Sequence, residues 1–586
     1  MKFSVFAQKL SKLEGMSSRT LISTEYSRLI GLCSSKEEVY MAVTMTTGRI
    51  SPKYSSLEFN FAQKQLLKTL QHIYLDIEEK YKDVGDIGSA IETSRETGSI
   101  YGENLGQGTD LQSMFEELYT FASITGPGSN ERKAKMLLRM LLREDNVSRK
   151  WITRIILGSM RLGLSEKGII DAISIYLVGD KNCSESIEKA VGVRSDIAEI
   201  AALTYDWKSE LSLEEIKANL SLLKVKLFTP VASKLVERVK DELEVIERMK
   251  VCFVQPKFDG LRIQAHFNVD RVEFYSRNME NNTAAYPDLV DALKSFAKLN
   301  GLESAIFDGE VVGYDQVSGK PLPFQDTSKR RRKSSNEERT SEIPVVYNVF
   351  DVLFENGVDM TASPIEERLL KLRSYSWTAS ILLTQTDKVS ETESLRQLFD
   401  RYVRIEGQEG VIAKKLSTPY DPGTRNFDWV KLKRSADSNL NDSTDLLVLG
   451  YYLGKGKRAG IGIGGILCGT YDKDTQKFYT VCKVGTGFSD EQLRMYLVEL
   501  DALVSAKQYN QENSEIAMSL QDGLVTVEPK IVVEIEADEI TASELHSAKY
   551  SLRFPRIKNW NRDKSFEQVT TIKELKRMFE IRKGVV

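Results

Sequence analysis

A lysine near the middle of the chain has the surroundings of a nucleophile. Lys257 opens the hexapeptide Lys257–Arg262 (KFDGLR), between an apolar run that ends at Gln255 and an alternating run, Arg262–Phe267. An ε-amine can attack phosphorus only after losing its proton, and desolvation and nearby cations lower a lysine pKa in that direction. The spacing predicts a nucleophilic lysine at a turn between two strands. A KxDG tetrapeptide taken alone also fits an ordinary surface turn.

A second segment could supply the cations. Residues Trp429–Lys433 (WVKLK) alternate apolar and basic side chains. In a strand this alternation puts Lys431 and Lys433 on one face and Val430 and Leu432 in the core. Two ammonium groups would then point into one pocket, where they could also hold a phosphate. The pattern favours phosphoryl chemistry.

Of two common phosphate-binding loops, the sequence disfavours one and excludes the other. Gly460–Gly465 fits GxGxxG, but it lies among short strands and lacks the helix and the distal acid of a dinucleotide site. No GxxxxGK[ST] occurs in the sequence, which excludes a P-loop.

The texture of the sequence changes twice, which predicts a multidomain chain. Residues 1–223 show long helical periodicities, residues 224–437 mix short β-like runs with helices, and residues 438–586 carry a series of strands separated by Gly-rich or polar turns. We expect an all-α domain, an α+β domain and a C-terminal β-barrel of the OB type, in that order. Apolar alternation puts Ile263, Ala265 and Phe267 on one face of a strand.

Six further motifs follow the lysine in order. They are Ser276–Asn278 (SRN), Phe307–Glu310 (FDGE), Tyr347–Leu353 (YNVFDVL), Glu409–Lys414 (EGVIAK), Trp429–Lys433 and Arg553–Arg556 (RFPR). With this series the chain resembles the covalent nucleotidyltransferases, specifically the ATP-dependent DNA ligases of archaeal and eukaryotic type. The resemblance extends to Pro323–Gln325, to Gly423–Arg425 and to the helical amino-terminal part, so it spans nearly the whole chain.

The resemblance implies an activity and its partners. Such an enzyme moves AMP from ATP to a lysine, passes it to the 5′-phosphate at a nick in duplex DNA, and lets the 3′-hydroxyl displace it, in DNA replication, repair and recombination. It implies a DNA-binding role for residues 1–223, adenylation for residues 224–437, and the cofactors ATP and Mg²⁺ (or Mn²⁺). Nicked double-stranded DNA is the expected partner of a monomer, and a sliding clamp is left open as another.

The resemblance also assigns roles to residues. Lys257 would carry AMP, Phe350 would stack on adenine, and Gln255, where the family often has an acid, would meet the adenine edge. Glu310 and Glu409 would hold the metal. The other expected nucleotide contacts are Arg262, Arg277, Glu310, Arg425, Lys431, Lys433, Arg553 and Arg556. Of these, Arg553 and Arg556 would have to reach the pyrophosphate by a movement of the barrel.

Three other kinds of protein are alternatives to an ATP-dependent DNA ligase. An RNA ligase or an mRNA-capping guanylyltransferase would use the same lysyl-nucleotide chemistry. Neither typically combines such an amino-terminal helical domain with a C-terminal barrel that ends in this motif. An NAD-dependent ligase would need four zinc-spaced cysteines, which this chain lacks. A nucleic-acid-binding module with a dead site would show erosion of the charged motif positions, and none is eroded.

Composition excludes little. The chain has 586 residues, 41% hydrophobic and 28% charged, with a net charge of −3 and a pI near 6.0. DNA contacts must therefore come from local basic patches. No apolar run is long enough for a membrane span or a signal peptide, so we expect a cytoplasmic protein with no membrane partner. Five scattered cysteines suit reduced, packed thiols.

Basic side chains gather in three places. A helix predicted over Ser148–Leu164 would carry Lys150, Arg154 and Arg161 on a solvent-facing stripe. The other two are the run Lys329–Lys333 and the tail Lys549–Lys564. Each could contact DNA phosphates or be an ordinary solvated surface, and for the run Lys329–Lys333 the flanking resemblance favours contact with the DNA backbone.

Overall fold

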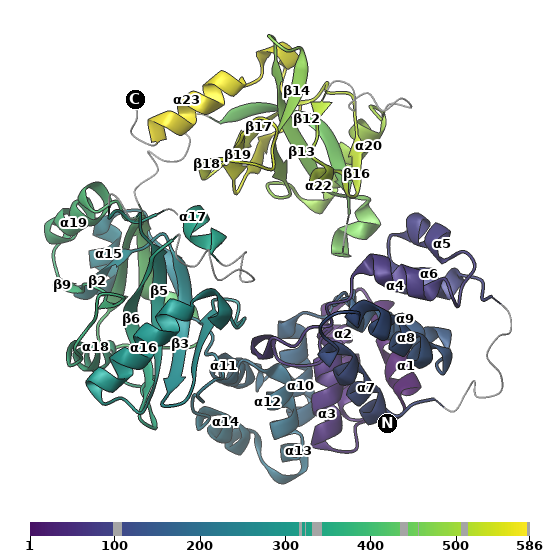
Figure 1. Cartoon of the computed structure of the whole chain (residues 1–586), viewed down its shortest axis with the longest axis horizontal. Helices are drawn as coiled ribbons and strands as arrows, with labels where there is room; N and C mark the ends of the chain where they lie inside the picture. Colours follow the sequence, from purple (N-terminus) through teal and green to yellow (C-terminus); the bar gives the residue numbers. More distant parts are fainter. Residues whose placement is uncertain are drawn as a thin grey trace. The chain divides into compact units, whose positions relative to one another are not determined.

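The computed structural model describes residues 1–97, 108–315, 319–322, 324–330, 343–433, 443–454, 456–504 and 514–582. The chain forms two compact units, residues 1–433 and 434–586 (Figure 1). The predicted boundary between residues 437 and 438 lies outside the described residues. Around the other predicted boundary, between residues 223 and 224, the last helix ends at Ser221 and the first strand begins at Leu235.

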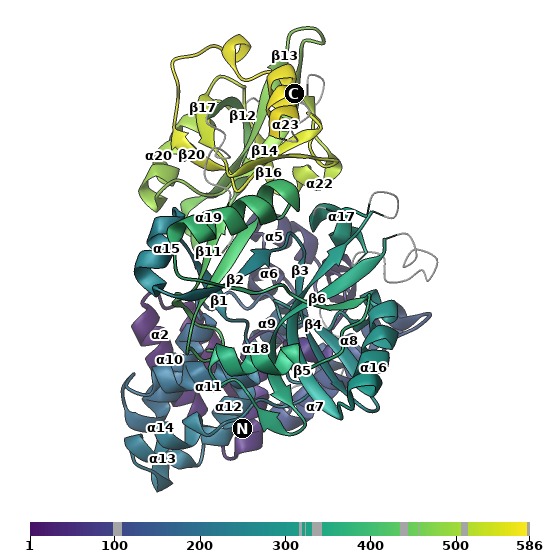
Figure 2. The same cartoon turned by 90° about the vertical axis from the view of Figure 1, so that its left-hand side faces the viewer.

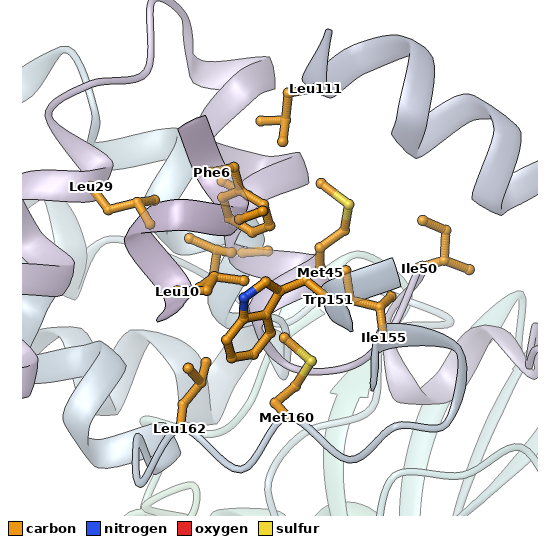
Figure 3. Close-up of a cluster of buried hydrophobic side chains, with 14 of the residues drawn as sticks. Phe6, Leu10, Leu29, Met45, Ile50, Leu111, Trp151, Ile155, Met160 and Leu162 are labelled. Atoms are coloured by element: carbon orange, nitrogen blue, oxygen red, sulfur yellow. The ribbon is translucent and has the colours of Figure 1, made fainter. Parts of the chain in front are cut away.

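The first part of unit one is helical, as predicted. Its α-helices are α1 (Phe3–Glu14), α2 (Arg19–Ile30), α3 (Lys36–Thr46), α4 (Gln63–Leu70), α5 (Ile77–Val84), α6 (Ile87–Thr93), α7 (Leu111–Ser123), α8 (Ser129–Leu142), α9 (Asn146–Ile156), α10 (Glu166–Val178), α11 (Ser184–Arg194), α12 (Ile197–Thr204), α13 (Trp207–Glu210) and α14 (Leu213–Ser221). Helical periodicity gives each long helix an apolar face, and these faces share one core. Trp151 lies within this core near Leu10 and Met160 (Figure 3). Its indole N–H donates to Ser11 Oγ at 2.8 Å.

The predicted solvent-facing basic stripe is wrong. The helix α9 ends at Ile156, and the side chains of Lys150 and Arg154 on it are only 3% and 1% exposed. Arg161 lies beyond the helix and is 32% exposed. Periodicity identified one face of the helix correctly, but that face is covered by other helices.

Carboxylates from distant parts of the sequence cover the stripe. Lys150 Nζ lies 2.6 Å from Glu14 of α1 and 2.9 Å from Glu92 of α6. Arg154 Nη2 lies 2.8 Å from Glu14 and 2.6 Å from Asp86, the N-cap of α6. Burial of these cations is tolerated because each is paired. The stripe is therefore a structural ion network.

Asp196 gives this helical part a pH-dependent stability. It caps α12, accepts a hydrogen bond from the Ala198 N–H at 2.9 Å, and is 9% exposed. Burial raises the pKa of Asp196 to about 6. The stabilisation that a raised acid pKa gives is complete below the unfolded pKa and is lost as the pH rises through the folded pKa. The cost of ionising Asp196 in the fold is therefore fully present above pH 6.

We expect Asp196→Asn to stabilise the protein at pH 8 by about 2–3 kcal/mol, because asparagine keeps the cap without the buried charge. The gain should shrink as the pH falls from 6 toward 4. Calorimetric unfolding at pH 8 and pH 5 measures both values. A gain of equal size at the two pH values would show that the charge of Asp196 is not its cause.

The rest of unit one is α+β, as predicted. Within the described residues its strands form two sheets. One has the order β1-β11-β10-β2-β9, with β1 (Leu235–Arg238), β2 (Cys252–Lys257), β9 (Asp387–Val389), β10 (Gly410–Lys415) and β11 (Arg425–Lys433). The other has the order β4-β3-β5-β6-β7 with β8 beside β6, formed by β3 (Leu261–Asn268), β4 (Val272–Ser276), β5 (Ser304–Gly313), β6 (Val345–Glu355), β7 (Val358–Asp359) and β8 (Ile381–Leu383).

Helices cover the outer face of each sheet. Apolar residues of α15 (Glu242–Met249) and α19 (Thr392–Asp400) share a core with β2, β10 and β11 (Figure 2). Apolar residues of α16 (Pro287–Asn300) and α18 (Ile365–Arg373) share another with β3, β5 and β6. Ile263, Ala265 and Phe267 all lie in this second core, as the alternation predicts. The polar side chains of both sheets therefore point away from the helices.

The second unit is β-rich, as predicted. Its strands are β12 (Thr444–Leu453), β13 (Ile463–Asp472), β14 (Lys477–Val484), β15 (Ser514–Glu515), β16 (Leu524–Thr526), β17 (Val532–Glu536), β18 (Glu539–Ala542), β19 (Tyr550–Arg553) and β20 (Arg556–Asn559). The α-helices among its described residues are α20 (Asp490–Asp501), α22 (Met518–Gln521) and α23 (Ile572–Arg582). Gly460–Gly465 runs from the end of a 3-10 helix (Gly456–Ile461) into β13, which pairs antiparallel with β12, so it does not form the strand-to-helix loop of a dinucleotide site.

Two further predictions concern the whole chain. All five cysteines are free and buried, as expected for packed thiols. In the part of the chain that the structure describes, no helix has the length and apolarity to cross a bilayer.

Candidate active site

Strand alternation builds the site from the inner faces of the two sheets. On β2, β10 and β11, the side chains of Val254, Val411, Ala413, Val430 and Leu432 point to the outer core. Their neighbours must therefore point inward, and these include the predicted site residues Gln255, Lys257, Lys431 and Lys433, with Lys414. From the facing sheet, the alternate positions bring Arg262, Asp308, Glu310 and Phe350 inward.

One carboxylate joins two of the lysines. Lys257, at the end of β2, contacts the Glu409 carboxylate through Nζ, and Lys433 Nζ contacts the same carboxylate. The strand register explains this, because Gly410 is the partner of both Lys257 and Lys433. A Cβ at Gly410 would lie 2.3 Å from the Leu432 carbonyl oxygen, so only glycine fits between the strands. Lys257 is 21% exposed, which leaves it accessible.

Lys431 completes the cluster of cations that the sequence predicts. Its side chain is half-buried on the face opposite Val430 and Leu432. Burial lowers the pKa of Lys431, and the charges of Lys433 and Lys257 lower it further. These three lysines therefore lie close enough to repel one another, a field that favours binding of an anion.

Glu310 faces this cluster from β5. Burial raises the pKa of Glu310 to about 7, although the nearby charges of Lys257 and Arg262 oppose the shift. Repulsion from the Glu409 carboxylate adds to the rise. The pocket thus contains two interacting carboxylates, Glu310 and Glu409, as well as its cations.

Arginines form another side of the pocket. Arg262 pairs with Asp308 through Nε at 3.1 Å and Nη2 at 2.7 Å, and donates to the Lys234 carbonyl oxygen at 2.8 Å. Partial burial lowers the pKa of Arg277, and the charges of Arg262 and Arg425 contribute. Arg277 and Arg425 are exposed. Arg262 and Arg425 therefore both lie within electrostatic range of Arg277.

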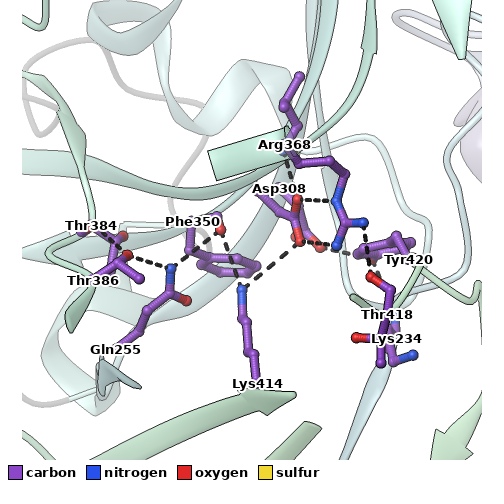
Figure 4. A network of polar contacts seen from close by, with 12 residues as sticks. Lys234, Gln255, Asp308, Phe350, Arg368, Thr384, Thr386, Lys414, Thr418 and Tyr420 are labelled. Carbon is purple, nitrogen blue, oxygen red and sulfur yellow. Dashed lines mark hydrogen bonds and ion pairs between the residues drawn. The ribbon is translucent and has the colours of Figure 1, made fainter. Parts of the chain in front are cut away.

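Gln255 and Phe350 lie side by side in the polar network between the two sheets (Figure 4). The Gln255 amide is 2% exposed and donates to Thr386 Oγ1 at 2.9 Å and to the Phe350 carbonyl oxygen at 3.5 Å. The Phe350 ring is half-buried, with the Arg262 guanidinium carbon 5.3 Å from its centroid. With its amide nitrogen engaged, Gln255 has its oxygen left as an acceptor.

Three buried residues that contact the predicted site residues had no role assigned from the sequence. They are Asp308, Lys414 and Tyr420. Asp308 accepts from Arg262 and, at 2.7 Å, from the Tyr420 hydroxyl. Lys414 lies under Phe350. Asp308 and Lys414 belong to motifs that the sequence analysis found, so their position was a usable signal. Tyr420 belongs to none of them.

Comparisons with known proteins agree along the whole chain. Family models match residues 2–174 (DNA ligase N terminus), 233–433 (ATP dependent DNA ligase domain) and 459–564 (ATP dependent DNA ligase C terminal region). A probable DNA ligase of Dictyoglomus turgidum is 35% identical over 99% of this chain and 97% of its own. The DNA ligase of Sulfolobus acidocaldarius is 32% identical over 99% and 98%. This chain belongs to the ATP-dependent DNA ligases.

A solved structure shows the same fold. The structure titled "Pmar-Lig_PreS3" covers 95% of this chain and 99% of its own with a TM-score of 0.53, at 17% identity. As a member of its family, the ligase seals nicks in DNA at the expense of ATP. The match of residues 2–174 to the DNA ligase N terminus excludes the RNA-ligase and capping alternatives.

Two predicted site residues of the ligase belong to the second unit. Arg553 and Arg556 flank the turn between β19 and β20, and each pairs within its own unit, with Glu539 at 3.1 Å and with Asp538. Phe554 between them is 64% exposed and has a φ of +53°. Lys257 belongs to the other unit, residues 1–433.

Carboxylates pair with most of the cations in the basic tail of the ligase, and one arginine of the run 329–333 is buried. In the tail, Lys558 and Arg562 pair with Glu534 at 3.2 and 2.9 Å, and Lys564 pairs with Asp445. Of the run 329–333, Arg330 is buried and donates to the Ala285 and Ile343 carbonyl oxygens, while residues 331–333 lie outside the described residues. Arg330 is therefore a structural residue.

Proposed function

We propose that Lys257 carries AMP in this ligase, with Gln255 at the adenine edge and Phe350 stacked on the ring. The observation that carries this proposal is the convergence of Lys257, Lys433 and Glu409 at one end of the pocket. A nucleophilic amine, cations for a phosphate and a carboxylate are the groups that transfer of a nucleotidyl group to lysine requires.

Glu310 and Glu409 fit a divalent ion, Mg²⁺ or Mn²⁺. Mg²⁺ is commonly bound by one or two carboxylates together with substrate phosphates. The described residues contain no cluster of three or more His, Cys, Asp or Glu that could hold a metal alone. The high pKa of Glu310 marks a carboxylate short of positive charge, which a bound cation would supply. When bound, the ion would neutralise charge on the transferring phosphoryl group.

The residues divide the work of the first step. The neutral Lys257 amine attacks the α-phosphorus through Nζ, a P–N bond forms, the bond to the pyrophosphate oxygen breaks, and the nitrogen releases a proton to solvent. Lys431 and Lys433 neutralise the α-phosphate oxygens, and Arg262, Arg277 and Arg425 contact the ribose and phosphates. Because Glu409 contacts the Lys257 ammonium, this carboxylate must exchange partners before the amine can attack.

The two later steps reuse the pocket. An oxygen of the DNA 5′-phosphate attacks the lysyl-AMP phosphorus and frees Lys257. The 3′-hydroxyl then attacks the activated 5′-phosphate and AMP leaves. The same lysines neutralise the phosphates in each step.

The parts of the chain have separate roles in this proposal. Residues 1–223 bind duplex DNA, residues 224–437 perform adenylation, and residues 438–586 form an OB-fold whose Arg553 and Arg556 bind pyrophosphate. The enzyme acts as a monomer on nicked duplex DNA, and a sliding clamp is the partner that this proposal leaves open.

Labelling with ATP tests the proposal. Incubation with α-labelled ATP and Mg²⁺ should leave covalent label on the chain that survives alkali but is lost in acid, as a P–N bond is, and mapping of the labelled peptide without acid should identify Lys257. γ-Labelled ATP should leave no label, because the γ-phosphate departs with pyrophosphate. Label on another residue, or label from GTP instead of ATP, would refute the assignment.

A further inference from the structure

Lys414 is a buried cation with a defined position between the two sheets. It lies on β10, and its side chain is 1% exposed. Its strand partners are Trp429 on β11 and Phe253 on β2, so the residue is held on both sides. The neighbouring Ala413 points to the outer core, and Lys414 therefore points inward toward β6.

The Lys414 ammonium makes two contacts with Phe350. Nζ donates to the Phe350 carbonyl oxygen at 3.3 Å and lies 4.8 Å from the centroid of the Phe350 ring. Nζ also lies 3.9 Å from the centroid of the Trp429 ring. A cation at this distance from aromatic rings is attracted to their faces. One side chain thus fixes both the backbone and the ring of Phe350 (Figure 4).

Lys414 also pairs with a buried carboxylate, that of Asp351, but Arg368 is the nearer partner of that carboxylate. Asp351 is fully buried, but its carboxylate is held by Arg368 at 2.7 and 3.2 Å, while Lys414 Nζ lies 3.9 Å away. Burial lowers the pKa of Lys414 to about 7. Burying a lysine in this way costs the fold free energy, because the ammonium is removed from water. The contacts of Lys414 with Phe350 offer a reason for its presence.

We propose that Lys414 is a positioning residue for ATP: from β10 it holds Phe350 of β6 in the orientation that stacks on adenine. This inference rests on the proposed role of Phe350. Gln255 holds the same carbonyl oxygen from β2, so two side chains of one sheet anchor the stacking residue of the other. Without Lys414, the Phe350 ring would lose its support from below while the reacting lysine keeps its neighbours.

Steady positioning of adenine should affect binding and leave chemistry unchanged. Stacking on the base is the same in the ground state and in the transition state, so its loss raises KM without lowering the maximal rate. We expect Lys414→Met to raise the KM for ATP in self-adenylation by about tenfold, the effect of losing one hydrogen bond and one cation–ring contact. The maximal rate of single-turnover labelling should stay within about twofold.

A double-variant cycle separates this role from a general structural one. The cycle uses the full chain with Lys414→Met, Phe350→Leu and both changes together. If Lys414 acts through Phe350, the double variant should have the KM of Phe350→Leu alone. The inference would be overturned if the increases in KM of the two single variants multiplied in the double variant. It would also be overturned if Lys414→Met had the wild-type KM, or if it lowered the maximal rate at an unchanged KM.

Further variants guard the experiment against misfolding. Lys415→Met changes the adjacent, exposed lysine of β10 and should leave KM unchanged. Should thermal unfolding show that Lys414→Met does not fold, Lys414→Gln replaces it, because glutamine keeps a donor without the charge. Its KM should exceed the wild-type value, and an unchanged KM would overturn the inference. Absence of label on wild-type Lys257 would instead refute the proposed function and this inference with it.

Discussion

Lys257→Ala is expected to abolish self-adenylation, with a loss of at least about 10³-fold in label from α-labelled ATP. Lys431 and Lys433 lie nearby, but they project from β11 and cannot occupy the position at the end of β2. The fold should persist, because Lys257 is partly exposed and Glu409 keeps its contact with Lys433. Gel detection of labelled protein, with thermal unfolding of each variant, measures both effects.

Two controls sharpen the Lys257 experiment. Lys388→Ala removes an exposed lysine from β9, the strand paired with β2, and should label like the wild type. A nick that already carries AMP on its 5′-phosphate bypasses the lysyl intermediate, so Lys257→Ala should still seal it. Label persisting in Lys257→Ala would remove this residue as the nucleophile.

Local periodicity accounts for what the sequence could predict. A strand alternates its faces, so Ile263, Ala265 and Phe267 were placed in the core correctly. The same alternation placed Val430 and Leu432 in the core and Lys431 on the inner face. The strands of unit one that carry these motifs have a register set by their buried faces. Motifs that are far apart in the sequence therefore come together in one site.

Long-range pairing accounts for what the sequence could not predict. The basic face of α9 was found, but nothing in its own sequence showed that Glu14 and Asp86 would cover it. Carboxylates that are distant in the sequence likewise pair with the basic tail, as Glu534 does with Arg562. Charge patterns along one element identify a face, and only tertiary structure shows what lies against it.

The candidate site shows the same division. Motif positions led to Lys257 and Glu409, while the contact between them depends on the pairing of β2 with β10. Lys414 was visible as the end of a motif, but a lysine in a sequence gives no sign that it is 1% exposed and directed at an aromatic ring. Burial of a charged residue is a property of the assembled sheets.

Changing Arg553 or Arg556 to alanine is expected to slow self-adenylation by about 10²-fold. The loss of rate in sealing a pre-adenylated nick should be smaller by a factor of at least about ten. Pyrophosphate leaves only in the first step, so residues that bind it should matter only there. Single-turnover rates for labelling by ATP and for joining of a pre-adenylated nick give the two values for each variant.

The fold should tolerate both changes. Arg553 and Arg556 are 42% and 50% exposed, and exposed ion pairs such as theirs with Glu539 and Asp538 contribute little to stability. Arg494→Ala, an exposed arginine of α20, is the matched control and should change neither rate. Equal losses in the two assays would mean that the arginines serve all steps of the reaction or the DNA itself, and would contradict their assignment to pyrophosphate. A selective loss would instead explain why both arginines are half-exposed and held by carboxylates that a pyrophosphate can replace.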